Sequence, residues 1–207
     1  MIKFKELNSG NKEFSKGFES FLSKRNLVTA EVSNTVRDII SQIRNKGDVA
    51  LKSLTKEFDN FAAEDFFVSE REINEILKDF DKSLIKSFEF SFDKIINFQS
   101  ECFDSLNLNF SREEITRKFR TIDSVGMYIP GGKASYPSTV LMGAAPAIAC
   151  GVKKISIASP AQNGALNPSV IAAAKVVGID RIYKIGGAQA IAALALGTEQ
   201  ISKVEKI

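Results

Sequence analysis

The sequence predicts an α/β protein in which a helical N-terminal region is followed by an incomplete, doubly wound parallel sheet. Two observations predict this fold class. Before about residue 121 the apolar residues recur at helical spacing, and after it short extended segments alternate with Ala-rich helical segments. Alternating strands and helices are typical of βαβ units, in which crossover helices join parallel strands.

The composition changes near the same position. All sixteen Phe lie at or before Phe119, all five Pro lie at or after Pro130, and most charged residues precede residue 121. Such a shift is typical of two architectural units joined in sequence. We therefore expect a mostly helical N-terminal region over residues 1–123 and an incomplete Rossmann-like domain over residues 124–207.

The helical region is predicted from stripes, stops and caps. A first helix should end at Gly47, and Asp48 is placed to cap a second. Ser69 and Glu72 form a capping-box pattern at the start of a third helix. The candidate inward positions are Val32, Val36, Ile39, Ile40, Ile43, Leu51, Leu54, Phe58, Ile73, Ile76, Leu77 and Phe80.

A longer helix is predicted over residues 84–103, and an extended strand should follow it. The candidate core positions of this helix are Phe88, Phe92, Ile95, Ile96 and Cys102, and the strand anchors are Ile115, Phe119 and Ile122. Aromatic residues at helical spacing are far more often core than part of a cofactor site.

The second region should contain three βα units. The strands are expected over residues 124–129, 154–158 and 181–185, and the helices over residues 138–150, 168–177 and 188–196. Asn167 and Pro168 are typical of the first residues of a helix, and Gly197 is typical of the residue after one.

Composition excludes several function classes. Lys and Arg number 28 against 25 Asp and Glu, with the signs interspersed, so no nucleic-acid partner is expected. No apolar run reaches the length of a membrane span, and no secretory signal is visible, so we expect a cytoplasmic protein. Cys102 and Cys150 are expected to be buried thiols. The sequence contains no histidine, which excludes two frequent catalytic and zinc-binding designs from this chain.

Two glycine-rich turns stand where predicted strands lead into helices, at residues 130–132 and 186–187. In open α/β sheets such turns line the crevice where ligands bind. Glycine permits close backbone approach, and free N–H groups at a helix start favour an anionic group such as pyrophosphate. Neither turn matches a standard nucleotide fingerprint, and glycine in such turns is also ordinary turn chemistry.

The amino-acid motifs of the second region are more specific than its glycine turns alone. It contains Ser-Val-Gly-Met-Tyr-Ile-Pro-Gly-Gly over residues 124–132, Tyr-Pro-Ser-Thr-Val-Leu-Met over residues 136–142, and Gly-Gly-Ala-Gln-Ala-Ile-Ala-Ala-Leu-Ala over residues 186–195. These segments closely resemble the corresponding segments of histidinol dehydrogenases. The resemblance extends weakly through residues 45–51 and 58–59.

The resemblance implies an NAD-dependent, zinc-containing homodimer that oxidises L-histidinol through the aldehyde to L-histidine, in histidine biosynthesis. Carried over by motif, Tyr128 and Gln189 are the NAD-contacting positions, so residues 124–207 are expected to bind NAD. An aromatic ring with a polar tip and an amide that both donates and accepts suit that role. The alternative readings are a strand-end core residue for Tyr128 and a helix-capping amide for Gln189.

The resemblance also implies features that this sequence lacks. Family members use a Glu-His pair and zinc ligands that include histidines, and all of these lie in their second half. We therefore predict no catalytic residue and no metal ligand here, and an N-terminal portion that is inactive unless a complementing C-terminal half is supplied. The alternative is a non-catalytic NAD-binding or dimerisation module left from a split gene. An aldehyde-dehydrogenase-like enzyme with a Cys nucleophile is disfavoured, because no base is adjacent to Cys150.

Overall fold

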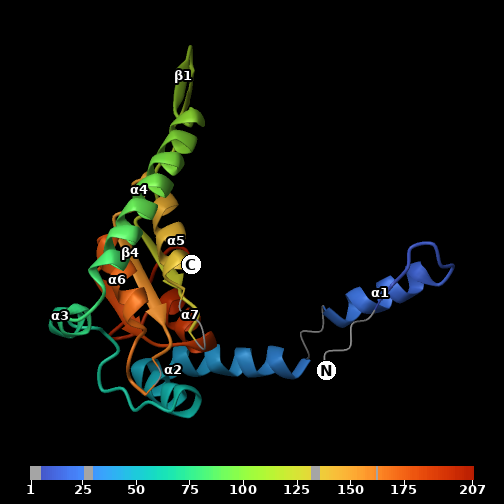
Figure 1. Cartoon of the computed structure of the whole chain (residues 1–207), viewed down its shortest axis with the longest axis horizontal. Coiled ribbons are helices and arrows are strands. Elements are labelled where there is room, and N and C mark those ends of the chain that lie inside the picture. Colours follow the sequence, from blue (N-terminus) through green and yellow to red (C-terminus); the bar gives the residue numbers. More distant parts are fainter. Residues whose placement is uncertain (1–5, 26–29, 132–135, 162) are drawn as a thin grey trace. The chain divides into compact units, whose positions relative to one another are not determined.

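The computed structural model describes residues 6–25, 30–131, 136–161 and 163–207 (Figure 1). They form two compact units, Met1–Asp38 and Ile39–Ile207. The first unit contains helix α1, Phe14–Arg25, in which Phe14 and Phe18 stack with ring centroids 5.5 Å apart. The second unit contains the sheet and also helices α3 (Glu70–Leu77) and α4 (Lys82–Ser105), so the division that the composition predicts at residue 123 marks where the sheet begins within this unit.

Helix α2 spans Ala30–Asp59 and is interrupted by a kink at Gly47, where φ is 51° and ψ is −129°. This is the position at which the sequence predicts one helix to stop and another to begin. A φ in this range is readily adopted only by glycine. The inward faces match the prediction in part: Leu51 and Leu54 are buried, whereas Val32 and Phe58 are exposed.

Two reciprocal hydrogen bonds fasten the kink to the end of the chain. The backbone N–H of Asp48 donates to Glu199 Oε2 over 3.0 Å, and the backbone N–H of Gln200 donates to Asp48 Oδ2 over 3.0 Å. Gln200 Oε1 also accepts the backbone N–H of Phe66. Asp48 therefore holds a distant loop in addition to starting the second half of α2, and these contacts fix where Asp59 lies.

The predicted α/β fold is confirmed, with a parallel three-stranded sheet in the order β3-β4-β5. The strands and the helices between and after them are β3 (Ser124–Tyr128), α5 (Pro137–Ala149), β4 (Lys154–Ser159), α6 (Pro168–Val176), β5 (Arg181–Lys184) and α7 (Gly187–Leu196). After α7 the chain returns to the outer side of β3, where Val125 and Lys206 form a parallel bridge. The strand order therefore reverses at β3, with β4 and β5 on one side of this strand and residue 206 on the other.

At the opposite edge of the sheet, β5 pairs with a segment that the sequence does not predict. Residues 66–68 run antiparallel to β5: the N–H of Val68 donates to Ile182 O, and the N–H of Lys184 donates to Phe66 O. This segment is followed by helix α3, Glu70–Leu77. The parallel sheet thus has one antiparallel edge.

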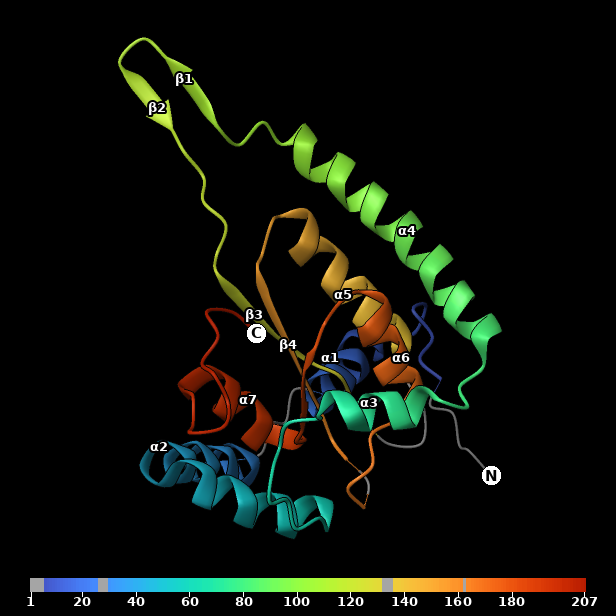
Figure 2. The same ribbon diagram turned by 90° about the vertical axis from the view of Figure 1, so that its left-hand side faces the viewer.

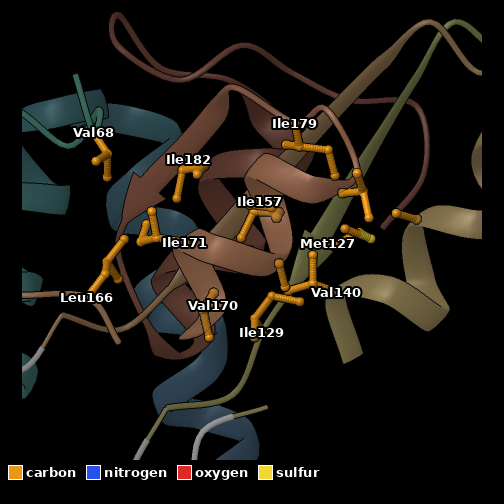
Figure 3. Packing of buried hydrophobic residues seen from close by; sticks show 14 of the residues in the cluster. Val68, Met127, Ile129, Val140, Ile157, Leu166, Val170, Ile171, Ile179 and Ile182 are labelled. Atoms are coloured by element: carbon orange, nitrogen blue, oxygen red, sulfur yellow. The ribbon is translucent and has the colours of Figure 1, made fainter. Parts of the chain in front are cut away.

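Helices cover both faces of the sheet (Figure 2). On one face α5 and α6 pack against Met127, Ile129 and Ile157, and these residues form the larger apolar cluster (Figure 3). On the other face α2 and α7 pack against Ala158, Tyr183 and Ile185 in a second cluster. Because successive strand residues point to opposite faces, each strand supplies both clusters. This arrangement is a doubly wound sheet.

Helix α4 (Lys82–Ser105) lies over α5 and α6 and leads to a protruding hairpin of β1 (Phe110–Arg112) and β2 (Ile115–Arg117), as Figure 2 shows. The helix is less buried than predicted. Phe88, Phe92 and Ile95 pack against the larger cluster without becoming fully buried, whereas Phe90 and Phe98 are 66% and 62% exposed.

Two predictions for this region are wrong. Cys102 is exposed and Cys150 is only half-buried, so neither is a fully buried thiol. The extended segment forms an antiparallel hairpin in place of one strand, with Phe119 and Ile122 exposed beyond it. Cys102, Phe119 and Ile122 share one reason, because the C-terminal end of α4 and the hairpin extend beyond the sheet, whereas Cys150 is the residue that ends α5. No helix in the described part of the chain is long and apolar enough to cross a membrane.

Candidate functional site

The strand order of the sheet reverses at β3, which lies between β4 and the segment at Lys206. In open α/β sheets, ligands bind outside the carboxyl ends of the strands where the strand order reverses. Tyr128 is the last residue of β3, and its side chain lies on the face that carries α2 and α7. The two positions predicted as cofactor contacts therefore lie on the same face of the sheet: Tyr128 at the end of β3, and Gln189 in α7, which follows β5.

A hydrogen bond joins the ends of β3 and β5 across the sheet. The backbone N–H of Gly187, at the start of α7, donates to the Tyr128 hydroxyl over 3.1 Å. Tyr128 is half-buried and Gly187 is exposed, so the contact lies at the protein surface. The hydroxyl proton of Tyr128 remains available as a donor, because a phenol both donates and accepts.

Pro160 brings the two glycine turns together. It follows β4 and lies between the turn after β3 and the turn after β5. A Cβ atom added to Gly186 would lie 2.5 Å from Pro160 Cβ, and one added to Gly131 would collide with the same ring. Gly132, the third residue of the first predicted turn, lies outside the described residues. Glycine is therefore required at both turns by close packing on one proline, and the turns share one edge of the molecule.

Gln189 lies beneath this surface in the first turn of α7. Its side chain is only 2% exposed, and Nε2 has no hydrogen-bond partner among the described residues. The N-cap residue of α7 is Gly186, which has no side chain with which to cap the helix. Because buried polar atoms are nearly always hydrogen-bonded, an orphaned amide nitrogen beside a surface turn is unusual. The alternative reading of Gln189 as a capping amide has no hydrogen bond to support it.

Asp59, the last residue of α2, reaches the same turn. Its carboxylate accepts the backbone N–H of Gly186, and burial raises the pKa of this carboxyl, while the Gly186 hydrogen bond partly offsets that rise. Oδ2 is buried without a hydrogen-bond partner in the described residues. The sequence analysis assigned Asp59 no role, because only the fold brings the end of α2 to a turn so far along the chain.

These contacts correct one step of the sequence argument. The N–H groups of Gly186 and Gly187 were expected to be free for an anion, but Asp59 accepts from the first and Tyr128 from the second. The turn therefore presents a carboxylate and a phenol to a ligand. A hydrogen-bond donor suits these groups better than a phosphate does.

An apolar cavity of about 960 Å³ runs along the outer edge of β3, and Tyr128 and Ile129 are among its lining residues. Its other walls come from α5, the segment before β3 and the final residues, among them Gly143, Ala147 and Ile207. The mostly apolar walls suit packing with apolar groups.

No group of three or more metal-ligating side chains occurs among the described residues. The sequence has no histidine, and its two cysteines lie on separate helices or helix ends. The residues of the described chain therefore do not fit a zinc centre.

The sheet order, the helices on both faces and the glycine turns at the reversal define a doubly wound α/β protein of the kind that binds ligands at the carboxyl ends of its strands. A sequence model of the histidinol dehydrogenase family matches residues 22–207. The chain belongs to this family, as its motifs indicate, and the family is one of oxidoreductases.

Individual relatives agree with this assignment. The chain is 39% identical over 205 residues to histidinol dehydrogenase of Agrobacterium fabrum, covering 97% of this chain and 48% of the relative. It is 45% identical over 181 residues to that of Oceanobacillus iheyensis, covering 86% and 42%. The crystal structure of histidinol dehydrogenase from Elizabethkingia anophelis superposes with a TM-score of 0.79 at 34% identity, covering 86% of this chain and 42% of that one. The chain thus spans about half the length of these relatives.

Proposed function

We propose that this chain is the NAD-binding N-terminal portion of a histidinol dehydrogenase, an enzyme that oxidises L-histidinol to L-histidine. The observation that carries the proposal is the meeting of the two family motifs at one edge: the Tyr128 hydroxyl accepts the Gly187 N–H, and Pro160 packs against both glycine turns. Two motifs far apart in sequence that form one surface at a strand-order reversal are typical of a dinucleotide site.

The residues at this edge fit NAD. Tyr128 offers a half-exposed ring and a hydroxyl proton, and Gln189 offers an amide nitrogen without a partner in the described structure. When bound, NAD would accept a hydride, and the protein would supply binding and orientation. Tyr128 and Gln189 are the residues that would hold it.

The described residues do not fit a zinc centre, and none of them is assigned to substrate binding or proton transfer. No chemical step is therefore assigned to this chain. We propose that the zinc site, the proton-transfer residues and much of the L-histidinol site are supplied by a C-terminal half, and that the active form is a homodimer of complete subunits or a complex of the two halves. The expected cytoplasmic location stays a prediction.

Titration of the chain with NAD⁺ by calorimetry tests the binding proposal. Gln189→Ala and Tyr128→Phe should each weaken binding roughly threefold to tenfold, as loss of one hydrogen bond does. Gln42→Ala, which removes an exposed glutamine from α2, should leave the affinity unchanged. Unchanged affinity in both site variants would remove these residues from the site.

The activity proposal is tested with L-histidinol, NAD⁺ and zinc. The purified chain should produce no NADH above a buffer blank, and activity should appear when a C-terminal half of a family member is added. Steady-state turnover by the chain alone would contradict the proposal. The absence of any histidine favours a second candidate, a non-catalytic NAD-binding or dimerisation module, and continued inactivity with the added half would support it.

A further inference from the structure

The two backbone donors of the second glycine turn are already used within the protein. Asp59 accepts the N–H of Gly186, and Tyr128 accepts the N–H of Gly187. A phosphate placed at this turn would have to displace both acceptors and would lie beside the Asp59 carboxylate. Like charges at short range repel, and the repulsion is larger where solvent is partly excluded.

Asp59 lies at this turn without an ion-pair partner among the residues that the structure describes. The two ion pairs found among the described residues are Arg71–Glu75 and Lys184–Glu72, and neither involves Asp59. Asp59 is half-buried: Oδ2 is buried without a hydrogen-bond partner in the described structure, and the carboxylate accepts the Gly186 N–H. A carboxylate can accept more than two hydrogen bonds, so a ligand hydroxyl that reaches it would meet an acceptor, whereas a ligand phosphate would meet a negative charge.

The topology indicates which part of a dinucleotide comes near. The segment from β3 through α5, β4 and α6 to β5 is one βαβαβ unit, and the chain then crosses to the far side of β3. Doubly wound dinucleotide-binding sheets consist of two such units, and in the first one an acidic side chain accepts from the 2′-hydroxyl of the adenosine ribose. Here the acidic side chain comes from outside the unit, from the end of α2.

We propose that Asp59 determines cofactor specificity: its carboxylate makes the Gly186–Gly187 turn a subsite for the adenosine ribose of NAD and excludes the 2′-phosphate of NADP. This inference rests on the proposed NAD site. It assigns a role to a residue outside the glycine motifs.

The test compares affinities for NAD⁺ and NADP⁺, measured by calorimetry on the whole chain. The unaltered chain should bind NAD⁺ about tenfold or more tightly than NADP⁺, and Asp59→Asn should reduce the ratio to about threefold or less, mainly through tighter binding of NADP⁺. Asn keeps an oxygen that can accept the Gly186 N–H. Glu57→Gln, which removes an exposed charge two residues away, should leave the ratio unchanged.

A second measurement needs no variant. Raising the salt concentration should bring the affinities of the unaltered chain for NAD⁺ and NADP⁺ closer together, because salt screens the repulsion between the Asp59 carboxylate and the 2′-phosphate. If Asp59→Asn leaves the ratio of the two affinities unchanged, or weakens the binding of NAD⁺ and NADP⁺ equally, the specificity role is overturned while the proposed NAD site stands. Binding of neither ligand by the unaltered chain would overturn the proposed function and this inference together.

Discussion

Replacing Gln189 with methionine is expected to stabilise the fold and weaken NAD binding at the same time. The side chain is 2% exposed with Nε2 unsatisfied in the described structure. An unsatisfied buried amide costs about 1–3 kcal/mol, whereas an unbranched apolar residue of similar volume costs less than about 1.5 kcal/mol to fit. Both residues favour helices. The net expectation is a gain of about 1 kcal/mol in the free energy of unfolding.

Urea unfolding followed by circular dichroism would measure this change, and the thermal midpoint should rise by about 2–4 °C. Gln42→Met on the exposed surface of α2 serves as the control and should shift stability by less than about 0.5 kcal/mol. Calorimetry with NAD⁺ completes the test. If Gln189→Met lowers stability by about 1 kcal/mol and leaves NAD affinity intact, Gln189 has a structural role and the reasoning fails.

Two further predictions concern the contact between the α2 kink and the C-terminal segment. Gly47→Ala should destabilise the fold by about 2 kcal/mol in urea unfolding, because it forces alanine to φ 51° and its Cβ would lie 2.7 Å from Glu199 Oε2. The control is Gly178→Ala, at φ 77° with open space around it, which should cost only about 1 kcal/mol. Equal losses of stability in the two variants would contradict a role for the Glu199 contact. The Asp48 N–H holds the pKa of the Glu199 carboxyl below its usual value of 4.5, so this group adds stability above that pH and loses the contribution as the pH falls further. Glu199→Gln should therefore flatten the decline of stability below about pH 4.5, and identical pH slopes in the two proteins would rule this out.

Local signals in the sequence predicted most of the regular structure. Ser69 Oγ accepts the Glu72 N–H and Asn167 Oδ1 accepts the Ser169 N–H, as caps should. These contacts span two or three residues, so a short pattern contains both partners. The capping box is only half formed, because the Glu72 carboxylate pairs with Lys184 Nζ over 3.0 Å, a partner that no local pattern contains.

The unpredicted features depend on contacts between distant segments. Residues 66–68 carry no strand pattern of their own, and their pairing depends on the exposed side of β5. In α4 the aromatic residues exceed what one narrow contact stripe can bury, so the composition overstated its burial. Sequence periodicity describes which face of a helix is apolar, but it does not say how much of that face another element covers.

The candidate site was predicted in part. The motifs identified Tyr128 and Gln189, and the structure brings them to one edge, while their contact with NAD stays a prediction. Pro160 could have been found, because it directly follows the predicted strand between the two glycine turns. Asp59 carried no local signal beyond its place in a weakly similar segment, and only the packing of α2 against α7 brings it to Gly186.

The antiparallel segment at residues 66–68 also limits how copies of this chain can associate. It occupies hydrogen-bonding groups on the outer side of β5, just as residues 205–206 occupy those of Ser124 and Gly126 on the outer side of β3. Very short edge strands hinder edge-to-edge pairing with another chain. Both edges of this sheet are therefore less suited to strand-to-strand association than the bare edges of β3 and β5 would be.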